Sequence, residues 1–296
     1  MIKQGKTSGF NFDFLGKAKL FAGLSIVLMI LSAVIIAKKG FNYGIDFAGG
    51  TEIQVQFSEA VTTSAVRDFT KKMNLERASV QSFGDTHEYL IRMDSLQGQT
   101  DKETNQMLNA LIEKITTGLN TEFKAQSPVI RRVDSVGPQV GSELKRNGLL
   151  AIFYCLLMIL IYVALRFDYK YAPAAVFCLF HDALITMCIF ALIDHEVNVQ
   201  TLAAILTIIG YSLNDTIIIF DRIRENVTLS RDTPFYDLVN SSINDTLSRT
   251  ILTSLTTLFA VAAMYFFATG VIKDFAFALG LGIIIGTYST VYVASP

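Results

Sequence analysis

Charged residues are scarce in this chain of 296 residues. Asp, Glu, Lys and Arg make up 17% of it, against about 25% in soluble domains, and 51% of the residues are hydrophobic. The net charge of −1 lacks the positive excess that nucleic-acid binding requires, so no nucleic-acid partner is expected. The mean hydropathy of +0.43 is instead typical of a membrane protein.

Cysteine and histidine are also rare. The three cysteines, Cys155, Cys178 and Cys188, all fall in apolar stretches, which predicts small buried side chains and no disulfide framework. His87 has no cysteine or second histidine nearby and is expected at the surface. No Ser–His pair and no set of metal ligands has a credible spacing. We therefore expect neither an enzyme nor a bound metal or cofactor.

Long apolar runs are abundant. A helix of about 20 apolar residues can cross a bilayer. Six such segments are present, namely Leu20–Ala37, Leu149–Leu165, Ala172–Ile193, Thr201–Phe220, Ile251–Ala268 and Phe275–Ala294. The first is too long for a cleavable signal peptide and is expected to remain as a signal anchor. The sequence therefore predicts a polytopic α-helical membrane protein with six transmembrane helices.

Lysine and arginine in the short loops predict the orientation of these spans. They occur in the N-terminal tail and in two of the connections, as Lys3, Lys6, Lys17, Lys19, Arg166, Lys170, Arg222, Arg224 and Arg231. They are absent from the loop Asp194–Asn198 between the third and fourth spans. Positively charged loops stay in the cytoplasm, so both termini are expected there. The long polar segment after the first span is then expected outside.

That polar segment, residues 40–147, has the pattern of a compact α/β domain. Strand-like alternation occurs at 43–57, 78–83, 88–93 and 123–136, with a turn at Gly84 and Asp85, and helical patterns occur at Val61–Met73 and Lys102–Leu119. The order βαββαβ is that of a ferredoxin-like domain. We therefore expect a cytoplasmic tail at 1–19, the first transmembrane helix at 20–39, a ferredoxin-like periplasmic domain at 40–147 and a five-helix membrane domain at 148–296.

Three connecting features carry further expectations. Gly49 and Gly50 lack the lysine of a phosphate-binding loop and predict a turn or a close backbone contact. The segment Ser135–Asn147 contains Gly-Pro and a further glycine, which predict a hinge or a plain surface turn. A cytoplasmic amphipathic connector is expected near 222–248. Its pattern at Thr233–Leu247 predicts an in-plane helix, with a soluble connector as the alternative.

Asp215 is the most informative polar residue within the spans. It lies inside the fourth apolar run, in GYSLNDTIIIFDRIREN. A carboxylate there costs about 2.5–3.5 kcal/mol on insertion scales and usually faces a protein interior. Asn214 adjoins it, and Ser212 lies one helical turn earlier on the same face. The sequence therefore predicts a polar seam inside a helix bundle.

Neighbouring spans contain two more polar sites. Arg249 begins the fifth span, which is rich in hydroxyl groups, and His181 and Asp182 lie near the middle of the third. A carboxylate that can exchange a proton, beside an arginine that cannot, is the minimum apparatus for proton-coupled motion. A static charge pair that locks the helices is the alternative. His181 and Asp182 form either a second polar site or a pair that satisfies itself.

Four stretches in the same order, FNYGIDFAGG, VGPQVGSEL, GYSLNDTIIIFDRIREN and RTILTS, resemble the SecF family over nearly the whole chain. Members are the smaller membrane subunit of the bacterial SecDF accessory translocase, in the resistance–nodulation–division superfamily. The resemblance implies six spans, one exported domain and a place in the cytoplasmic (inner) membrane. It also implies a SecD-like partner, the SecYEG channel, an unfolded preprotein substrate and contact with membrane lipids.

The resemblance further implies a mechanism. The family drives preprotein export with the proton-motive force, without a cofactor, and its functional charges correspond to Asp215 and Arg249. With Asn214 and Ser212 beside them, these residues form the expected proton relay, completed by an aspartate of the partner subunit. The alternatives are a passive scaffold or preprotein-binding subunit, and one half of a related exporter of small molecules or lipids.

Overall fold

The computed structural model describes residues 12–75, 78–83, 87–95, 101–167, 169, 171–230 and 232–295. Several residues used in the loop-charge and turn predictions lie outside these ranges, namely Lys3, Lys6, Gly84, Asp85, Lys170 and Arg231. The chain divides into two compact units. One contains Tyr43–Leu149, and the other contains the residues up to Asn42 together with those from Leu150 onward.

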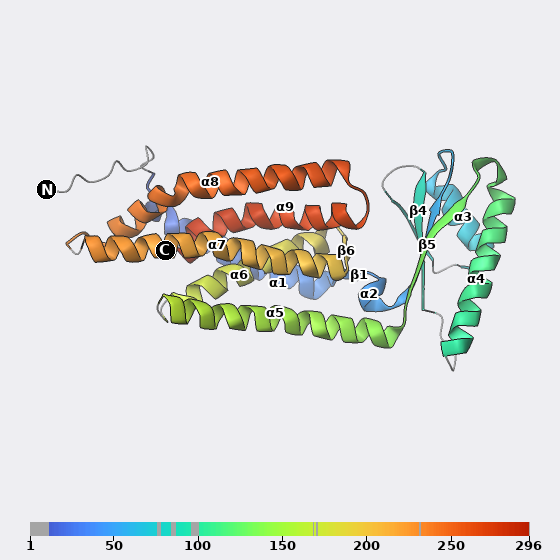
Figure 1. The fold of residues 1–296 in the computed structure, drawn as a ribbon, viewed down its shortest axis with the longest axis horizontal. Coiled ribbons are helices and arrows are strands. Elements are labelled where there is room, and N and C mark those ends of the chain that lie inside the picture. Colours follow the sequence, from blue (N-terminus) through green and yellow to red (C-terminus); the bar gives the residue numbers. More distant parts are fainter. Residues whose placement is uncertain are drawn as a thin grey trace. The chain divides into compact units, whose positions relative to one another are not determined.

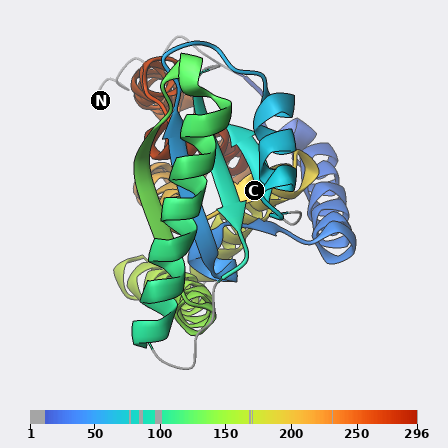
Figure 2. The ribbon, with the colours of Figure 1, turned by 90° about the vertical axis from the view of Figure 1, so that its right-hand side faces the viewer.

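The unit Tyr43–Leu149 contains a four-stranded antiparallel sheet with two helices on one face (Figures 1 and 2). Its main elements are β2 (Gly50–Gln56), α3 (Thr63–Lys72), β3 (Ser79–Ser82), β4 (Glu88–Met93), α4 (Asp101–Glu122) and β5 (Val129–Val136), with the short helices α2 (Ile45–Ala48) and η2 (Lys124–Gln126) beside them. The strands lie in the order β3-β4-β2-β5. This is the βαββαβ succession that the hydrophobic patterns predict.

Alternation along β2 places its apolar side chains under the two helices. Ile53 and Val55 are fully buried and pack with Phe69 of α3 and Ile115 of α4. The polar residues between them point away from the core, as the two-residue period of a strand requires. This unit therefore has a hydrophobic core of its own.

Gly49 and Gly50 form the close backbone contact that the sequence predicts. Both have left-handed backbone angles, with φ of +75° and +147°. A Cβ atom on Gly49 would lie 3.0 Å from the Cα of Pro138, and one on Gly141 would lie 3.0 Å from the backbone nitrogen of Gly49. A side chain at Gly49 or at Gly141 would therefore push the residues around Gly49 away from the segment that begins at Pro138.

The expected turn at Ser135–Asn147 is shorter than predicted. Helix α5 begins at Pro138 and continues without interruption to Arg166, so Gly141 is helical and only Gly137 remains between strand and helix. Proline is well suited to the first position of a helix, because its missing N–H has no partner there in any case. The hinge expected in this segment is thus part of a long helix.

Six helices are long and apolar enough to cross a membrane, which confirms the predicted polytopic architecture. They are α1 (Ala18–Lys39, preceded by η1, Leu15–Lys17), α5 (Pro138–Arg166), α6 (Ala172–Leu192), α7 (Val199–Leu229), α8 (Phe235–Phe267) and α9 (Val271–Ser289, followed by the π-helical turn η3, Thr290–Ala294). The short strand β1 (Asn42–Tyr43) follows α1, and the short strand β6 (Glu196–Val197) lies between α6 and α7. Helices α6, α7 and α9 have the largest shares of buried residues and form the centre of this unit (Figure 1).

The connector expected at 222–248 has different bounds in the structure. Helix α7 runs to Leu229, and α8 is one helix from Phe235 to Phe267, with no glycine or proline to break it. The apolar residues that suggested a membrane-surface helix, Val239 among them, pack instead with Ile219 and Ile223 of α7. The amphipathic pattern therefore reflects helix packing.

The first described residues are held by two asparagines of α8. The side-chain oxygen of Asn244 accepts from Phe12 N at 2.8 Å, and its amide nitrogen donates to Phe12 O at 2.9 Å. The oxygen of Asn240 accepts from Phe14 N at 2.9 Å. These bonds satisfy backbone groups that precede the first helix, in the way that side-chain caps do.

Replacing Asn244 by alanine is expected to release this segment. The substitution removes both hydrogen bonds to Phe12 and should cost about 1–3 kcal/mol locally. Hydrogen exchange of residues 12–16, measured by mass spectrometry, should accelerate, whereas Ser248→Ala at an exposed position of the same helix should leave it unchanged. Equal exchange in the two variants would contradict the proposed role of Asn244.

Candidate functional site

Asp215 lies on the inward face of α7, as its place in the sequence predicts. Its side chain is 3% exposed, and the neighbouring Ser212 and Thr216 on the same face are also buried. From the described residues one weak hydrogen bond reaches the carboxylate, from the Asn214 amide to Oδ1 at 3.5 Å. Among the described residues no cation forms a direct ion pair with Asp215. A buried carboxylate so weakly satisfied is costly to keep ionised.

Arg249 is the cation whose charge acts on this carboxylate. It lies within α8 and interacts electrostatically with Asp215 without forming a direct ion pair in the described structure. Arg249 and Asn214 are exposed on this chain, although both belong to membrane-spanning helices. The structure thus brings Asp215, Asn214 and Arg249 together at one margin of the unit, where the charges are close but not in contact.

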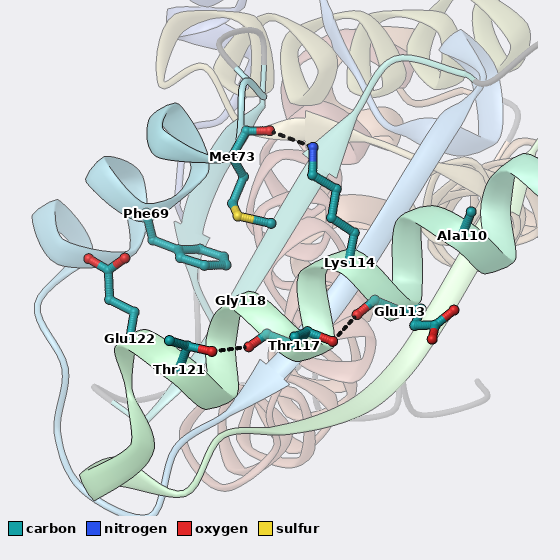
Figure 3. A pocket seen from close by; sticks show the side chains of 9 residues that line it. All are labelled: Phe69, Met73, Ala110, Glu113, Lys114, Thr117, Gly118, Thr121 and Glu122. Atoms are coloured by element: carbon teal, nitrogen blue, oxygen red, sulfur yellow. Dashed lines mark hydrogen bonds between the residues drawn. The ribbon is translucent and has the colours of Figure 1, made fainter.

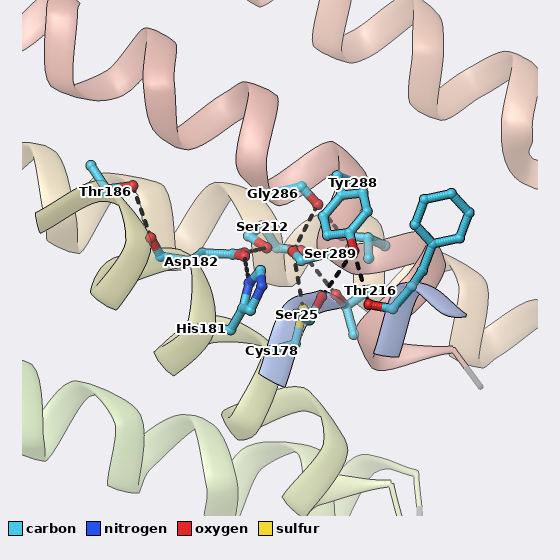
Figure 4. A network of polar contacts seen from close by, with 12 residues as sticks. Ser25, Cys178, His181, Asp182, Thr186, Ser212, Thr216, Gly286, Tyr288 and Ser289 are labelled. Atoms are coloured by element: carbon cyan, nitrogen blue, oxygen red, sulfur yellow. Dashed lines mark hydrogen bonds and ion pairs between the residues drawn. The ribbon is translucent and has the colours of Figure 1, made fainter. Parts of the chain in front are cut away.

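Ser212 belongs to a different cluster from the one expected. Its hydroxyl donates to Asp182 Oδ2 at 2.6 Å, and Asp182 Oδ1 lies 2.9 Å from His181 Nδ1 (Figure 4). All three side chains are buried, His181 and Asp182 completely. Ser212 therefore joins α6 to α7 one helical turn from Asp215. The two sites that the sequence presents separately meet on one face of α7.

This buried cluster extends to two more helices that the sequence reasoning missed. Cys178 Sγ donates to Ser289 Oγ at 3.2 Å, and Tyr288 of α9 shares a hydrogen bond of 2.9 Å with Ser25 of α1 (Figure 4). Thr186 donates to its own helix, at Asp182 O. The available signal was the presence of hydroxyl groups within the first and last apolar spans.

A set of hydrogen bonds between α7 and α8 was also not predicted from the sequence. Arg222 donates to Asp245 Oδ2 from Nε at 2.9 Å and from a terminal nitrogen at 2.6 Å, and Asn226 donates to Ser242 at 2.8 Å. Asp245 is mostly buried, so this pair is less screened by solvent than a surface pair. No sequence spacing indicates that the two residues meet. The link ties together the ends of the helices that bear Asp215 and Arg249.

The soluble unit has an open groove of about 610 Å³ between α3 and α4 (Figure 3). Met73 and Phe69 line one side, and Lys114 of α4 donates to Met73 O at 3.3 Å. Phe69 is also a core residue, and the rim mixes charges of both signs, so the groove has no evident chemistry. Across the part of the chain that the structure describes, no three His, Cys, Asp or Glu side chains gather as a metal site requires.

Comparison with known proteins identifies a family. Residues 115–296 match the family "Protein export membrane protein SecD/SecF, C-terminal", and residues 34–61 match "SecD/SecF GG Motif". The chain is 43% identical over 287 residues to protein translocase subunit SecF of Calditerrivibrio nitroreducens, covering 96% of this chain and 92% of that protein. It is 37% identical over 285 residues to protein translocase subunit SecF of Escherichia coli O157:H7, covering 96% and 86%.

A solved structure has the same fold. The crystal structure of SecDF, a translocon-associated membrane protein from Thermus thermophilus, matches 97% of this chain with a TM-score of 0.83 and 37% identity. The match spans 38% of that longer chain. The remainder of the Thermus thermophilus protein has no counterpart in this chain.

Proposed function

This chain belongs to the SecF family of protein translocase subunits, and from that premise we propose that it uses the proton-motive force to assist preprotein export. Its six apolar helices and its relatives make it a multi-pass protein of the inner membrane with a role in Sec translocation. In the proposal both termini are cytoplasmic and residues 40–147 are periplasmic. The proposed partners are a SecD-type subunit, the SecYEG channel and an unfolded preprotein, in contact with membrane lipids.

The observation that carries the proposal is the state of Asp215. A buried carboxylate with one weak hydrogen bond and no direct ion pair among the described residues is poorly stabilised as an anion. An aspartate that stays ionised would be expected to have both oxygens satisfied, as those of Asp182 are. The arrangement therefore favours a carboxylate that gains and loses a proton.

Arg249 supplies the means to convert that proton into movement. The guanidinium always stays charged, so its attraction to Asp215 exists only while the carboxylate is ionised. Protonation would weaken the attraction between α7 and α8, and deprotonation would restore it. Each charge moved across the membrane field gains about 2.3 kcal/mol per 100 mV, which is enough to bias such a two-state movement.

The exposed polar residues beside Asp215 also indicate that this surface of the unit is covered by a partner. Asn214 and Arg249 are exposed on this chain although they lie in membrane-spanning helices. Polar side chains in a membrane normally face protein or a water-filled cavity. The SecDF chain from Thermus thermophilus has sequence beyond the matched 38% that could supply such a cover. In the proposal a SecD-type subunit covers this margin and contributes the second half of the relay.

Substitution of Arg249 tests the proposal. Proteoliposomes that contain this chain with its SecD-type partner should lose proton uptake driven by a pH gradient when Arg249 is replaced by methionine, because the attraction to Asp215 is gone. Arg249→Lys keeps the charge and should retain part of the uptake. Arg224→Gln removes an exposed cation elsewhere on α7 and is the matched control. Wild-type uptake by Arg249→Met would argue for the passive scaffold.

A further inference from the structure

One atom in the buried cluster has an unmet hydrogen-bonding requirement. His181 is completely buried, its Nδ1 faces Asp182, and its Nε2 has no partner among the described residues. Buried polar groups are almost always paired, so an exception requires a reason. In the neutral ring with Nδ1 protonated, Nε2 is a free lone pair, and in the charged ring it is a free donor. Either form suits an atom that exchanges a proton.

The groups around the ring limit what it can exchange with. On α6 these are Asp182 and Cys178, and from α7 Ser212 reaches the same carboxylate. From α9 the ring of Tyr288 lies 6.2 Å from the imidazole, and its hydroxyl is bonded to Ser25 of α1. Tyr292 of η3 packs on Tyr288 in turn. Among the residues labelled in Figure 4, Asp182 is the one carboxylate.

The charge balance of this cluster depends on the histidine. With a neutral imidazole the cluster carries the buried negative charge of Asp182, and with an imidazolium it is neutral overall. A buried charge is costly unless it is paired and hydrogen-bonded. Both oxygens of Asp182 accept hydrogen bonds, so the carboxylate is positioned as the counter-ion of a protonated ring.

We propose that His181 and Asp182 form a second proton-binding site of the membrane unit, coupled to Asp215 through α7. The inference rests on the proposed function. A proton from a hydronium ion adds to the lone pair of Nε2 and leaves a water molecule, while Nδ1–H continues to donate to Asp182; release is the reverse of this step. Ser212 is a positioning residue. It holds Asp182 from the same face of α7 that bears Asp215, so a movement of α7 that breaks this bond changes the affinity of the cluster for its proton.

Protonation of the ring is directly observable. In the full chain, assembled with its SecD-type partner in lipid nanodiscs, ¹⁵N NMR of labelled histidines at a series of pH values should show both the neutral and the charged pattern for His181, exchanging reversibly. In Asp182→Asn the charged pattern should be absent. The signals of His195, whose Nε2 lies 3.4 Å from Asp274 Oδ1, serve as the reference for a histidine outside the cluster in the same spectra. A wild-type His181 that keeps one pattern throughout would overturn the proposal.

Proton uptake provides a second, independent readout. His181→Asn retains a nitrogen that can donate to Asp182 but cannot be protonated, and it should lower uptake by proteoliposomes at least about tenfold. Thr207→Val, which removes an exposed hydroxyl of α7 that donates to Ala203 O at 2.8 Å, should leave uptake unchanged. Wild-type uptake by His181→Asn would also overturn the proposal. If a variant fails to assemble, the titration of wild-type His181 decides.

The two proposals fail in different ways. If Asp215→Asn retains normal uptake, the proposed function is wrong whatever His181 does. If Asp215→Asn abolishes uptake while His181 does not titrate, the proposed function stands and the second proton site is wrong.

Discussion

Replacing Asp215 by asparagine is expected to abolish proton uptake and to reduce proton-driven export to the level seen without the complex. Asparagine keeps the shape of the side chain but cannot bind and release a proton. The site would then remain permanently in its neutral state, without the attraction of Arg249. Uptake is measured by a pH-sensitive dye in proteoliposomes, and export by the appearance of protease-protected preprotein in inverted vesicles.

Two further variants separate this effect from loss of structure. Asp215→Glu keeps a titratable carboxylate and should retain part of the uptake, whereas Asp221→Asn removes an exposed carboxylate of the same helix and should change nothing. Asp215→Asn itself should not lower the thermal stability of the complex, because a buried charge that costs about 2.5–3.5 kcal/mol has been removed. Normal export by a stable Asp215→Asn complex would exclude the relay.

Replacing Gly282 by alanine is expected to have the largest effect on stability. A Cβ atom there would lie 2.2 Å from Cγ1 and 2.3 Å from Cδ1 of Ile208, a fully buried side chain of α7. The added methyl group must force α7 and α9 apart or distort Ile208. Overpacking of this kind typically costs about 1–3 kcal/mol. Thermal unfolding in detergent should show a correspondingly lower midpoint.

The same helix offers a matched control, and its partner residue on α7 offers a rescue. A Cβ atom on Gly280 would lie 3.4 Å from its nearest neighbour, Val261 Cγ1, so Gly280→Ala should be nearly neutral. Combining Gly282→Ala with Ile208→Ala removes the clashing atoms and should restore part of the stability lost in the glycine variant, with a coupling energy of about 0.5–3 kcal/mol. Equal midpoints for Gly280→Ala and Gly282→Ala would show that the crossing tolerates a side chain.

The predictions that succeeded rest on local properties of the chain. An apolar run of sufficient length is helical in a membrane whatever surrounds it, since its backbone groups must bond within the segment. The six spans could therefore be predicted from the sequence. So could the βαββαβ order, from the hydrophobic periods of the strands and helices. The buried position of Asp215 was predictable for a related reason, because a single carboxylate in an apolar run usually faces a protein interior.

The predictions that failed concern where helices end and what they face. The pattern at Thr233–Leu247 is amphipathic, but amphipathicity does not say whether the apolar side meets lipid headgroups or another helix. In the structure it meets α7, and α8 continues unbroken. The turn expected through Gly141 was also wrong: α5 begins at Pro138, and the helical Gly141 lies against the backbone of Gly49, where a Cβ atom would be crowded.

By itself the sequence determined the membrane architecture, the order of elements in the soluble unit and the identity of the unusual charges, all of which depend on composition and period along one segment. The tertiary structure alone decided which of those polar groups meet. It separated Asp215 from direct contact with Arg249, assigned Ser212 to Asp182, and left His181 Nε2 without a partner among the described residues. Such pairings depend on the rotation and crossing of α6, α7 and α9, which glycine contacts and side-chain packing set between residues far apart in the chain.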